Sequence, residues 1–216
     1  MNRRLIVVAT ALVALCLFAG AMFFYDRGGE APAPTLSGDN FVRPYSPIVG
    51  PQAAPVTIVE FFDPACEACR AMYPYVKEIL ARYPTQVRLV LRYAPLHQGS
   101  DKAVRILEAA RAQGKFDTIL EVLLARQAEW ASHHAPNLEA AWELAALAGL
   151  DIERARRDAV TPAVDRVLEQ DIADVNANSV RKTPTFFVNG KPLTSFGPQQ
   201  LYDLVTEEVR RMPSGS

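Results

Sequence analysis

Two cysteines separated by two residues stand where a strand pattern gives way to a helical one. Residues 56–62 are mostly β-branched and aromatic, which is the composition of a buried strand. An Asp-Pro pair interrupts the strand, and a helical pattern then begins at Cys66 and includes Cys69. In the first turn of a helix, the outer sulfur faces free backbone N–H groups and the positive end of the helix dipole, which favour a thiolate. The motif therefore indicates thiol–disulfide exchange.

The cysteine count supports redox chemistry over a structural or metal role. The chain has three cysteines, and the third, Cys16, lies in an N-terminal apolar stretch. Three are too few for a four-thiolate zinc or iron–sulfur site. A zinc site that used both paired cysteines would need two of His97, His133 and His134. A structural link across so short a loop would add little stability. We therefore predict neither a metal site nor a cofactor.

The N-terminus predicts export. Arg3 and Arg4 precede the apolar stretch 5–25, which as a helix would span about 31 Å, the thickness of a bilayer core. Positive charge before the stretch predicts a cytoplasmic N-terminus and an exported body. We favour residues 1–25 as a retained membrane anchor. The alternative is a signal peptide cleaved near residues 19–21. Either way the sequence predicts a periplasmic protein, in a compartment where disulfides persist.

The segment that follows is predicted to be a linker. Residues 26–55 contain six prolines, together with several Gly and Ser, so we expect an extended tether in which residues 41–45 can pack on the domain. The remaining residues are enough for one domain with a sizeable core. A net charge of −1 without a basic cluster argues against nucleic acid as a partner.

Hydrophobic periodicity predicts an α/β domain interrupted by helices. The order is β-α-β, five helices, then β-β-α. This places an α/β core at 56–98 and 178–211 and an all-helical insertion at 99–177. The first half of the core is expected to have a strand at 56–62, a helix from 66 to about 83 and a strand at 87–93. The insertion is expected to have helices at 100–114, 116–124 and 137–149, a short helix that begins at 151, and a helix at 161–175. The second half is expected to have a strand at 185–188, a turn at Asn189-Gly190, an edge strand at Pro192 and a helix at 197–209.

Over roughly residues 41 to 211, the sequence resembles the DsbA-like branch of the thioredoxin superfamily. Three features carry the resemblance: Glu60-Phe61-Phe62 before the Cys-x-x-Cys motif, Thr183-Pro184 directly before a strand, and the helical insertion. The resemblance implies a thioredoxin fold with an all-helical insertion of about five helices. It also implies that Cys66 is the nucleophile, that Cys69 is the buried resolving thiol, and that Pro184 is a cis-proline which helps Thr183 to bind an extended client chain.

Glu60 stands inside the apolar strand, where an ionised carboxylate is costly unless it is paired. One interpretation is that strand alternation turns it outward or pairs it with Arg88 or Arg92 on the neighbouring strand. The other follows from the resemblance, because the family has an acidic residue here. On that interpretation Glu60 accepts the proton of Cys69 as the mixed disulfide resolves.

Two further expectations concern charges near the cysteines. The best-known oxidant of the family has a histidine between its cysteines, whereas this chain has Glu67-Ala68. A carboxylate beside Cys66 should raise the pKa of that thiol and make the protein a milder oxidant. We expect His133 and His134 to be surface or satisfied polar residues, with copper or zinc capture as the alternative, and we assign no role to His97.

The sequence thus predicts a membrane-tethered, periplasmic protein thiol–disulfide oxidoreductase that needs no organic cofactor. Its partners would be exported client proteins with cysteines and an inner-membrane protein that resets the active pair. Oxidase, isomerase and reductase directions stay open. Two alternatives come from other classes: a thioredoxin-fold module that binds copper or zinc, and a periplasmic chaperone or assembly factor in which the thiols are incidental.

Overall fold

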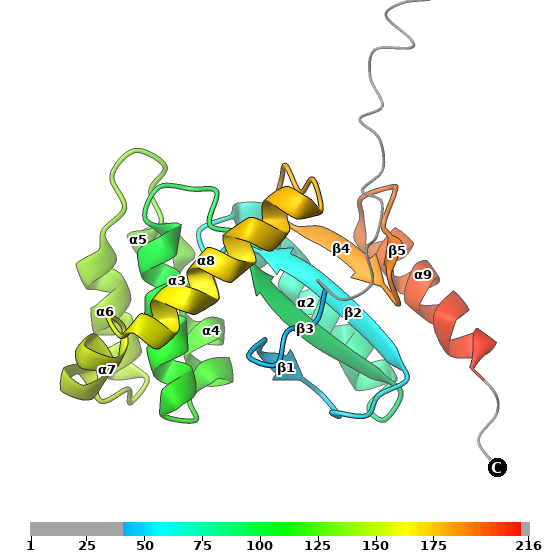
Figure 1. Ribbon diagram of the computed structural model, residues 1–216, viewed down its shortest axis with the longest axis horizontal. Helices are drawn as coiled ribbons and strands as arrows, with labels where there is room; N and C mark the ends of the chain where they lie inside the picture. The colour runs from blue at the N-terminus through cyan, green and yellow to red at the C-terminus, as the bar shows by residue number, and fades with distance from the viewer. Residues whose placement is uncertain (1–40, 213–216) are drawn as a thin grey trace, which may run out of the picture. The chain divides into compact units, whose positions relative to one another are not determined.

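A computed structural model describes residues 41–212 of the chain (Figure 1). The predicted anchor at 1–25 and the first part of the predicted tether, residues 26–40, lie outside this described part. Within residues 41–212, no helix combines the length and the apolar character needed to span a membrane.

A five-stranded sheet forms the centre of the described domain, in the order β1-β3-β2-β4-β5. Its two middle strands, β2 and β3, run parallel, and the outer strands are antiparallel to their neighbours. Helices cover both faces of the sheet, which is why β2 and β3 have near-continuous apolar sequences. The strands are β1 (Ile48–Val49), β2 (Val56–Phe62), β3 (Val87–Tyr93), β4 (Thr185–Val188) and β5 (Lys191–Pro192).

The two faces of the sheet pack against different helices (Figure 1). Helix α2 (Glu67–Arg82) lies on one face together with α9 (Pro198–Arg211), whereas α8 (Pro162–Ala177) crosses the other. Strand alternation sorts the core residues accordingly. Ile58 and Phe62 of β2 belong to the core of the α2 face, and Val59 and Phe61 belong to that of the α8 face.

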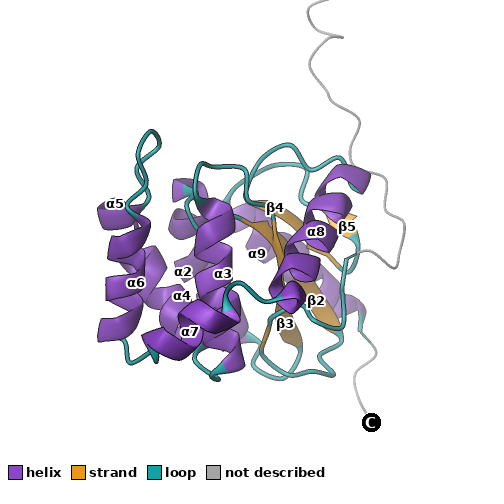
Figure 2. Cartoon of the chain, turned by 60° about the vertical axis from the view of Figure 1, so that its left-hand side comes forward, coloured by secondary structure: helices purple, strands orange, loops and turns teal. Residues whose placement is uncertain are grey.

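The segment between β3 and β4 is entirely helical and lies largely beside the sheet (Figure 2). Local signals position several of its helix ends: the side chains of Asn137 and Asp151 accept hydrogen bonds from backbone N–H groups in the first turns of α6 and α7. Besides α8, the helices are α3 (Ser100–Ala112), α4 (Phe116–Ala125), α5 (Gln127–Trp130), α6 (Leu138–Leu147) and α7 (Ile152–Asp158).

From residue 56 onward the predicted order of elements is confirmed, with one helix more than expected. Helix α5 was missed because it has four residues, too few to show a helical period. Its last residue, Trp130, is nonetheless buried, and the indole N–H donates to the carbonyl of Leu123 at 2.9 Å.

Residues 41–55 differ from the prediction of an extended tether. The ring of Phe41 packs on that of Phe187 with centroids 4.6 Å apart, and β1 pairs with β3. Arg43 reaches Asp174 of α8, with 2.7 Å between Nη2 and Oδ1. Prolines exclude a helix here but permit a two-residue edge strand, which proline-rich composition does not reveal. The packing of residues 41–45 on the domain is therefore as expected, whereas β1, within the part expected to be extended, was not.

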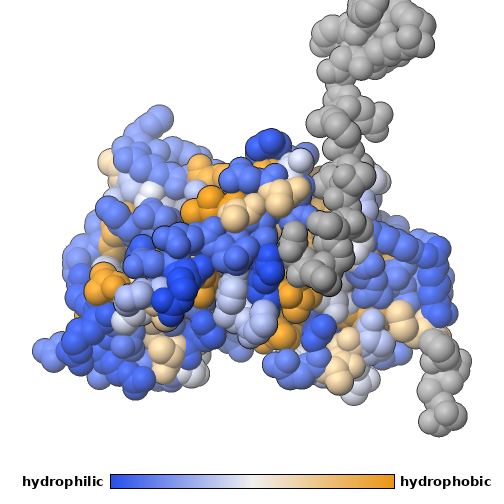
Figure 3. Space-filling view, viewed as in Figure 1, coloured by the Kyte–Doolittle hydropathy of each residue, from blue (hydrophilic) through white to orange (hydrophobic). Residues whose placement is uncertain are grey.

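The face of the molecule in Figure 3 is dominated by hydrophilic residues, with apolar residues in smaller patches between them. Among the described residues, the exposed large hydrophobic side chains are scattered along the chain. Leu96 is 48% exposed and lies in the loop after β3, close to the cysteine pair in space. The full set is Val42, Tyr75, Leu96, Leu147, Val160, Ile172 and Phe196.

Candidate active site

The cysteine pair lies where β2 ends and α2 begins. Cys66 is the N-cap residue of α2 with an extended backbone, and its N–H donates to the carbonyl of Asp63 at 3.1 Å. Its sulfur lies 3.2 Å from the carbonyl oxygen of Thr183, and the residue as a whole is 5% exposed. Cys69, one turn further along the helix, is fully buried.

The two thiols differ strongly in acidity. The pKa of Cys66 is lowered to about 5, first by a hydrogen bond from the Cys69 side chain, and then by Thr183 and by the backbone N–H groups of Ala68 and Cys69, against the effect of burial. The pKa of Cys69 is raised, chiefly by burial and then by its hydrogen bond to Cys66. At neutral pH the arrangement holds one thiolate beside one thiol, which is the condition for directed disulfide exchange.

The pKa of Cys66 is lowered although Glu67 follows it in the sequence, and Glu67 is not among the leading causes of its acidity. The Glu67 carboxylate is 58% exposed, and its Oε1 lies 3.0 Å from Nε2 of His133. Donors at the start of the helix, by contrast, point at the Cys66 sulfur itself. Short-range hydrogen bonds outweigh a solvated charge, because water screens the latter.

Glu60 is buried on the α2 face of the sheet, with 1% of its surface exposed. Its Oε2 has no hydrogen-bond partner among the described residues. Burial, followed by the negative charge of Cys66, raises the pKa of Glu60 to about 8, and a hydrogen bond with Cys69 acts in the opposite direction. Glu60 is therefore a mostly protonated carboxyl group beside the resolving thiol.

Both structural alternatives for Glu60 are excluded. It does not face solvent, and the two arginines proposed as its partners lie on the other face of the sheet. Arg88 donates to the hydroxyl of Thr57 at 2.9 Å, and Arg92 donates to Asp171 of α8 at 3.0 Å. Glu60 is in register with Leu91, whereas Arg92 is in register with Phe61, so alternation separates the two charges.

Thr183 and Pro184 lie in the loop that leads into β4, and the peptide bond between them is cis. Pro184 is buried. The Thr183 carbonyl contacts the Cys66 sulfur, although 117 residues separate them in the sequence. The fold thus brings together the start of α2 and the loop before β4. The sequence had indicated these two sites by separate motifs.

Asp63 organises the loop that carries the cysteines, and sequence reasoning used it only as a strand breaker. The side chain is fully buried. Its Oδ1 accepts from the N–H of Ala65 at 2.8 Å and from the Ser100 hydroxyl. Its Oδ2 accepts from the N–H groups of Leu96 and His97, at 2.8 and 3.0 Å. An acidic residue at the carboxyl end of a buried strand is the signal that could have identified this role.

Gln127 connects the helical segment to the same loop. It is 2% exposed, and its Nε2 donates to the carbonyls of Pro64 at 2.8 Å and Cys66 at 3.1 Å. The residue belongs to α5, the helix that the sequence did not reveal. Nothing local marks this glutamine, because its partners are 61 or more residues away.

The histidines lie in different settings. Nδ1 of His97 is 2.8 Å from Oδ2 of Asp63, while His133 is 54% exposed and contacts Glu67. The rings of His97 and His133 have centroids 6.0 Å apart. His134 is exposed, as expected. Across residues 41–212, no three His, Cys, Asp or Glu side chains form a group that could hold a metal ion.

Comparison with known proteins places this geometry in a family. The family model described as Thioredoxin matches residues 43–207. The chain belongs to the thioredoxin family. The thioredoxin fold with a helical insertion, predicted from the sequence, is confirmed, and solved structures of DsbA-type proteins share this fold.

Solved structures support the assignment. A thioredoxin-like oxidoreductase from Silicibacter pomeroyi DSS-3 is 30% identical, with a TM-score of 0.70, and the match covers 82% of this chain and 100% of that one. BdbD from Bacillus subtilis, in its oxidised form, is 20% identical with a TM-score of 0.68, covering 76% and 93%. The α-DsbA1 protein from Wolbachia pipientis is 15% identical with a TM-score of 0.68, and the match covers 79% of this chain and 94% of that one. The last two, at such low identity, show the fold alone.

Curated relatives are much longer proteins. A protein named Na(+)/H(+) antiporter NhaA from Herminiimonas arsenicoxydans is 35% identical over 164 residues, which are 76% of this thioredoxin-family chain and 25% of that protein. One named NhaA 3 from Salinispora tropica is 39% identical over 145 residues, covering 66% and 21%. The chain spans about a quarter of the length of these relatives. The names of these relatives describe ion transport by those longer proteins.

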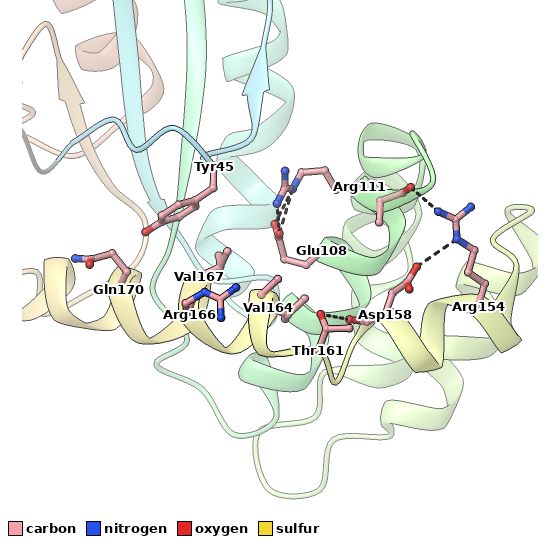
Figure 4. A pocket seen from close by; sticks show the side chains of 12 residues that line it. Tyr45, Glu108, Arg111, Arg154, Asp158, Thr161, Val164, Arg166, Val167 and Gln170 are labelled. Atoms are coloured by element: carbon pink, nitrogen blue, oxygen red, sulfur yellow. Dashed lines mark hydrogen bonds and ion pairs between the residues drawn. The ribbon is translucent and has the colours of Figure 1, made fainter.

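A cavity of about 670 Å³ lies away from the cysteines, lined mainly by α3, α7 and α8 (Figure 4). Its lining is charged, but the charges are largely paired: Arg111 with Glu108, and Arg154 with Asp158 at 3.3 Å. Tyr45, also in the lining, donates to Asp171 at 2.8 Å. The hollow is distinct from the redox site and contains no thiol.

Proposed function

We propose that this DsbA-like protein exchanges dithiols and disulfides with exported client proteins through Cys66 and Cys69. The observation that carries the proposal is the opposed acidity of the pair, with the pKa of Cys66 lowered to about 5 and that of Cys69 raised by burial. Cys66 has an exposed edge that a client sulfur can approach, and Cys69 does not. Cys66 is therefore the nucleophile and leaving group, and Cys69 is the resolving thiol.

In the oxidising direction, a client thiolate attacks Sγ of Cys66 in the disulfide form. The new client–Cys66 bond forms as the Cys66–Cys69 bond breaks, and the electron pair goes to Cys69. A second client thiolate then attacks the client sulfur of the mixed disulfide, and Cys66 leaves as a thiolate. The client loses two electrons and two protons; the pair gains both electrons, Cys69 keeps one proton, and the other goes to solvent.

Glu60 is the proton carrier for Cys69 in this scheme. With its pKa raised to about 8, the carboxyl group holds a proton at neutral pH and can give it to the Cys69 thiolate as that thiolate leaves. In the reverse direction the carboxylate accepts the Cys69 proton. Burying Glu60 with no hydrogen-bond partner at Oε2 among the described residues costs stability. A role in proton transfer would explain why such a residue is present.

The Thr183–Pro184 loop is the proposed client-binding edge. The Thr183 carbonyl already lies 3.2 Å from the Cys66 sulfur, so an extended client chain whose sulfur bonds to Cys66 must pass beside it. Leu96, 48% exposed in the neighbouring loop, offers apolar contact to the same chain. We propose backbone pairing at Thr183, with an apolar client side chain on Leu96.

The charge distribution favours the oxidase direction. A stabilised Cys66 thiolate favours the reduced form of the pair, which makes the disulfide form more oxidising. A pKa of about 5 for Cys66 lies between the values of about 7 for thioredoxin and about 3.5 for the strong oxidant DsbA. We therefore expect a reduction potential between about −270 and about −120 mV. The protein is thus still expected to be a milder oxidant than DsbA, but the reason is the intermediate pKa of Cys66 and not the charge of Glu67.

The proposed setting is the periplasm, with residues 5–25 as an inner-membrane anchor and a membrane partner that reoxidises the pair. The support is the sequence: arginines before an apolar stretch long enough to cross a bilayer. Separating the exported body from the membrane fraction in cells, with and without carbonate washing, tests the anchor. Recovery of the protein as a shortened soluble chain would show cleavage instead.

A Cys69→Ala variant of the full chain tests function and partner together. Without the resolving thiol, client disulfides remain attached to Cys66, so we expect mixed disulfides that dithiothreitol releases and mass spectrometry identifies. Cys66→Ser is the matched control and should capture nothing. Full biological function in a Cys66→Ser, Cys69→Ser double variant would instead favour the chaperone interpretation, and tight copper or zinc binding by the reduced pair would favour the metal-binding one.

A further inference from the structure

His97 lies beside the cysteine pair but has no part in the scheme above. It belongs to the loop between β3 and α3, and Asp63 holds it in two ways. Its backbone N–H donates to Oδ2 of Asp63 at 3.0 Å, and its ring Nδ1 lies 2.8 Å from the same oxygen. Asp63 also accepts from Cys66 through its backbone carbonyl, at 3.1 Å. One residue thus fixes both the imidazole and the nucleophilic cysteine.

Four ionisable side chains form a chain around Cys66. Asp63 contacts His97, the His97 ring lies 6.0 Å from that of His133, and His133 contacts Glu67 at 3.0 Å. Asp63 and Glu67 flank Cys66 in the sequence, so the two imidazoles bridge the two sides of the cysteine. The four groups come from the loop after β2, from α2, and from two loops of the helical segment.

We propose that His97, oriented by Asp63, is the cationic partner of the Cys66 thiolate in the reduced protein. The inference rests on the proposed function and adds the group that supplies positive charge where this chain lacks a histidine between its cysteines. The carboxylate accepts a hydrogen bond from Nδ1–H and so leaves Nε2 to carry or release the second proton. When Cys66 leaves the mixed disulfide with its electron pair, the imidazolium balances the new negative charge.

The electrostatics agree with this arrangement. The pKa of His97 is raised: burial opposes the charge, but the hydrogen bond and charge of Asp63, then the charges of Cys66 and Glu67, outweigh it. The effect must be reciprocal, since a thiolate that favours the imidazolium is favoured by it to the same extent. His133 is the other imidazole facing His97, and its Nε2 lies 3.0 Å from Oε1 of Glu67.

A purely structural role for His97 makes a different prediction. The loop is already held by backbone N–H groups of Leu96 and His97 and by the Ser100 hydroxyl, all on Asp63. Replacing the imidazole by an amide keeps these bonds. A structural histidine would therefore alter stability without altering the acidity of Cys66.

The test compares His97→Gln with His134→Gln, an exposed neighbour of His133, in the full chain carrying Cys16→Ser so that only the active pair contributes thiols. The rate of iodoacetamide alkylation is measured from pH 3 to 9. In the parent we expect a first rise near pH 5 and a second of about threefold above pH 6.5, where loss of the imidazolium proton makes the thiolate more nucleophilic. In His97→Gln the second rise should vanish and the first should move up by about one pH unit.

The redox equilibrium of His97→Gln with glutathione should change in line with the acidity of Cys66. A tenfold weaker thiolate changes that equilibrium constant by up to tenfold, which corresponds to about 30 mV toward a more reducing value. His134→Gln should match the parent in both measurements. An alkylation profile and potential of His97→Gln that equal those of the parent would overturn the inference, while the function proposed above would stand. A parent with an ordinary thiol pKa near 8.5 would instead overturn the proposed function.

A measurement without a variant at His97 guards against a folding defect. The imidazole of His97 is titrated by NMR in the reduced and in the disulfide form of the Cys16→Ser protein. Because oxidation removes the Cys66 thiolate, the pKa of the His97 imidazole should be about one unit higher in the reduced form than in the disulfide form. Equal values in the two forms would contradict the proposed pairing.

Discussion

The central sheet buries carboxylates on both faces, and the two faces treat them in opposite ways. On the α8 face, Asp171 accepts from Arg92 Nε at 3.0 Å, from the Tyr93 N–H at 2.7 Å and from the Tyr45 hydroxyl at 2.8 Å. On the α2 face, Glu60 has no cation beside it, and its Oε2 has no hydrogen-bond partner among the described residues. Both carboxylates are about 1% exposed.

The difference separates a structural acid from a titrating one. The arginine cluster ties three parts of the chain together, because Arg92 of β3 contacts Asp171 and Asp174 of α8, while Arg43 binds Asp174 and anchors residues 41–45. At Asp174 burial is outweighed by the hydrogen bonds of Arg43 and Arg92, which lower the pKa, whereas at Asp171 burial outweighs its arginine and raises the pKa. Glu60, with its pKa raised to about 8, can change protonation near neutrality.

The largest expected effect is from Arg92→Met. It leaves Asp171 without its arginine and Asp174 with one fewer, in a region closed to solvent, so we expect a loss of about 3–5 kcal/mol in the free energy of unfolding. Urea unfolding followed by circular dichroism measures it. Arg88→Met, on the same strand face but bonded to Thr57 and a backbone carbonyl, is the control and should lose about 1–2 kcal/mol. Similar losses in the two variants would mean that the buried carboxylates Asp171 and Asp174 add nothing to the cost of removing an arginine from this face.

The pH dependence of stability should reveal Glu60 and Cys66 with opposite signs. The pKa of Glu60 is raised from 4.5 to about 8 in the folded state, so its contribution falls as pH rises between those values. The pKa of Cys66 is lowered from 9.0 to about 5, so its contribution rises with pH over about 5 to 9. Each slope is at most about 1.4 kcal/mol per pH unit.

These contributions can be separated by substitution in the reduced protein. In Cys66→Ser, unfolding free energy should decline from pH 5 to 8, because the Cys66 contribution, which has the opposite sign to that of Glu60, is removed. In Glu60→Gln it should increase over that range. Chemical unfolding at each pH gives the slopes, and slopes of equal sign in the two variants would contradict the assignment.

Glu60→Gln should also slow one step of exchange. The amide keeps the shape but cannot supply or accept the Cys69 proton, so resolution of a preformed mixed disulfide should slow by about 100-fold. First attack, in which Cys66 is already a thiolate, should stay within about twofold. Stopped-flow kinetics of the reduced protein with a peptide disulfide, which follow the reducing direction, separate the steps. Unchanged resolution kinetics would mean that water, not Glu60, carries the proton.

Gln127→Ala should have the smallest effect. It removes hydrogen bonds to the carbonyls of Pro64 and Cys66, and we expect a loss of about 1–2 kcal/mol together with a changed reduction potential. Gln113→Ala is a matched control, since that exposed amide also donates to a backbone carbonyl, of Asp151 at 3.0 Å, far from the cysteines. It should leave the potential unchanged. A potential shift in the control but not in Gln127→Ala would refute the link between α5 and the cysteine loop.

Much of the fold follows from local patterns. The apolar run at 56–62, the Cys-x-x-Cys motif and the Asn189-Gly190 turn each report on a few adjacent residues, and each predicted element exists. The elements that were missed, β1 and α5, have two and four residues, too few for a period to be visible. Within the site, Cys66 and Cys69 carry a short-range signal, and Asp63 carries a weaker one at the end of its strand, whereas His97 and Gln127 carry none.

The amino-acid sequence by itself determined the α/β order, the position of the thiol pair at a helix start, and a carboxylate inside the adjacent strand. Tertiary structure decided which face that carboxylate occupies, which arginines it cannot reach, and which distant groups surround the sulfur. The physical reason is range. Periodicity and helix-end chemistry act over a few residues, while the acidity of a thiol depends on donors, charges and burial supplied by segments up to 117 residues away.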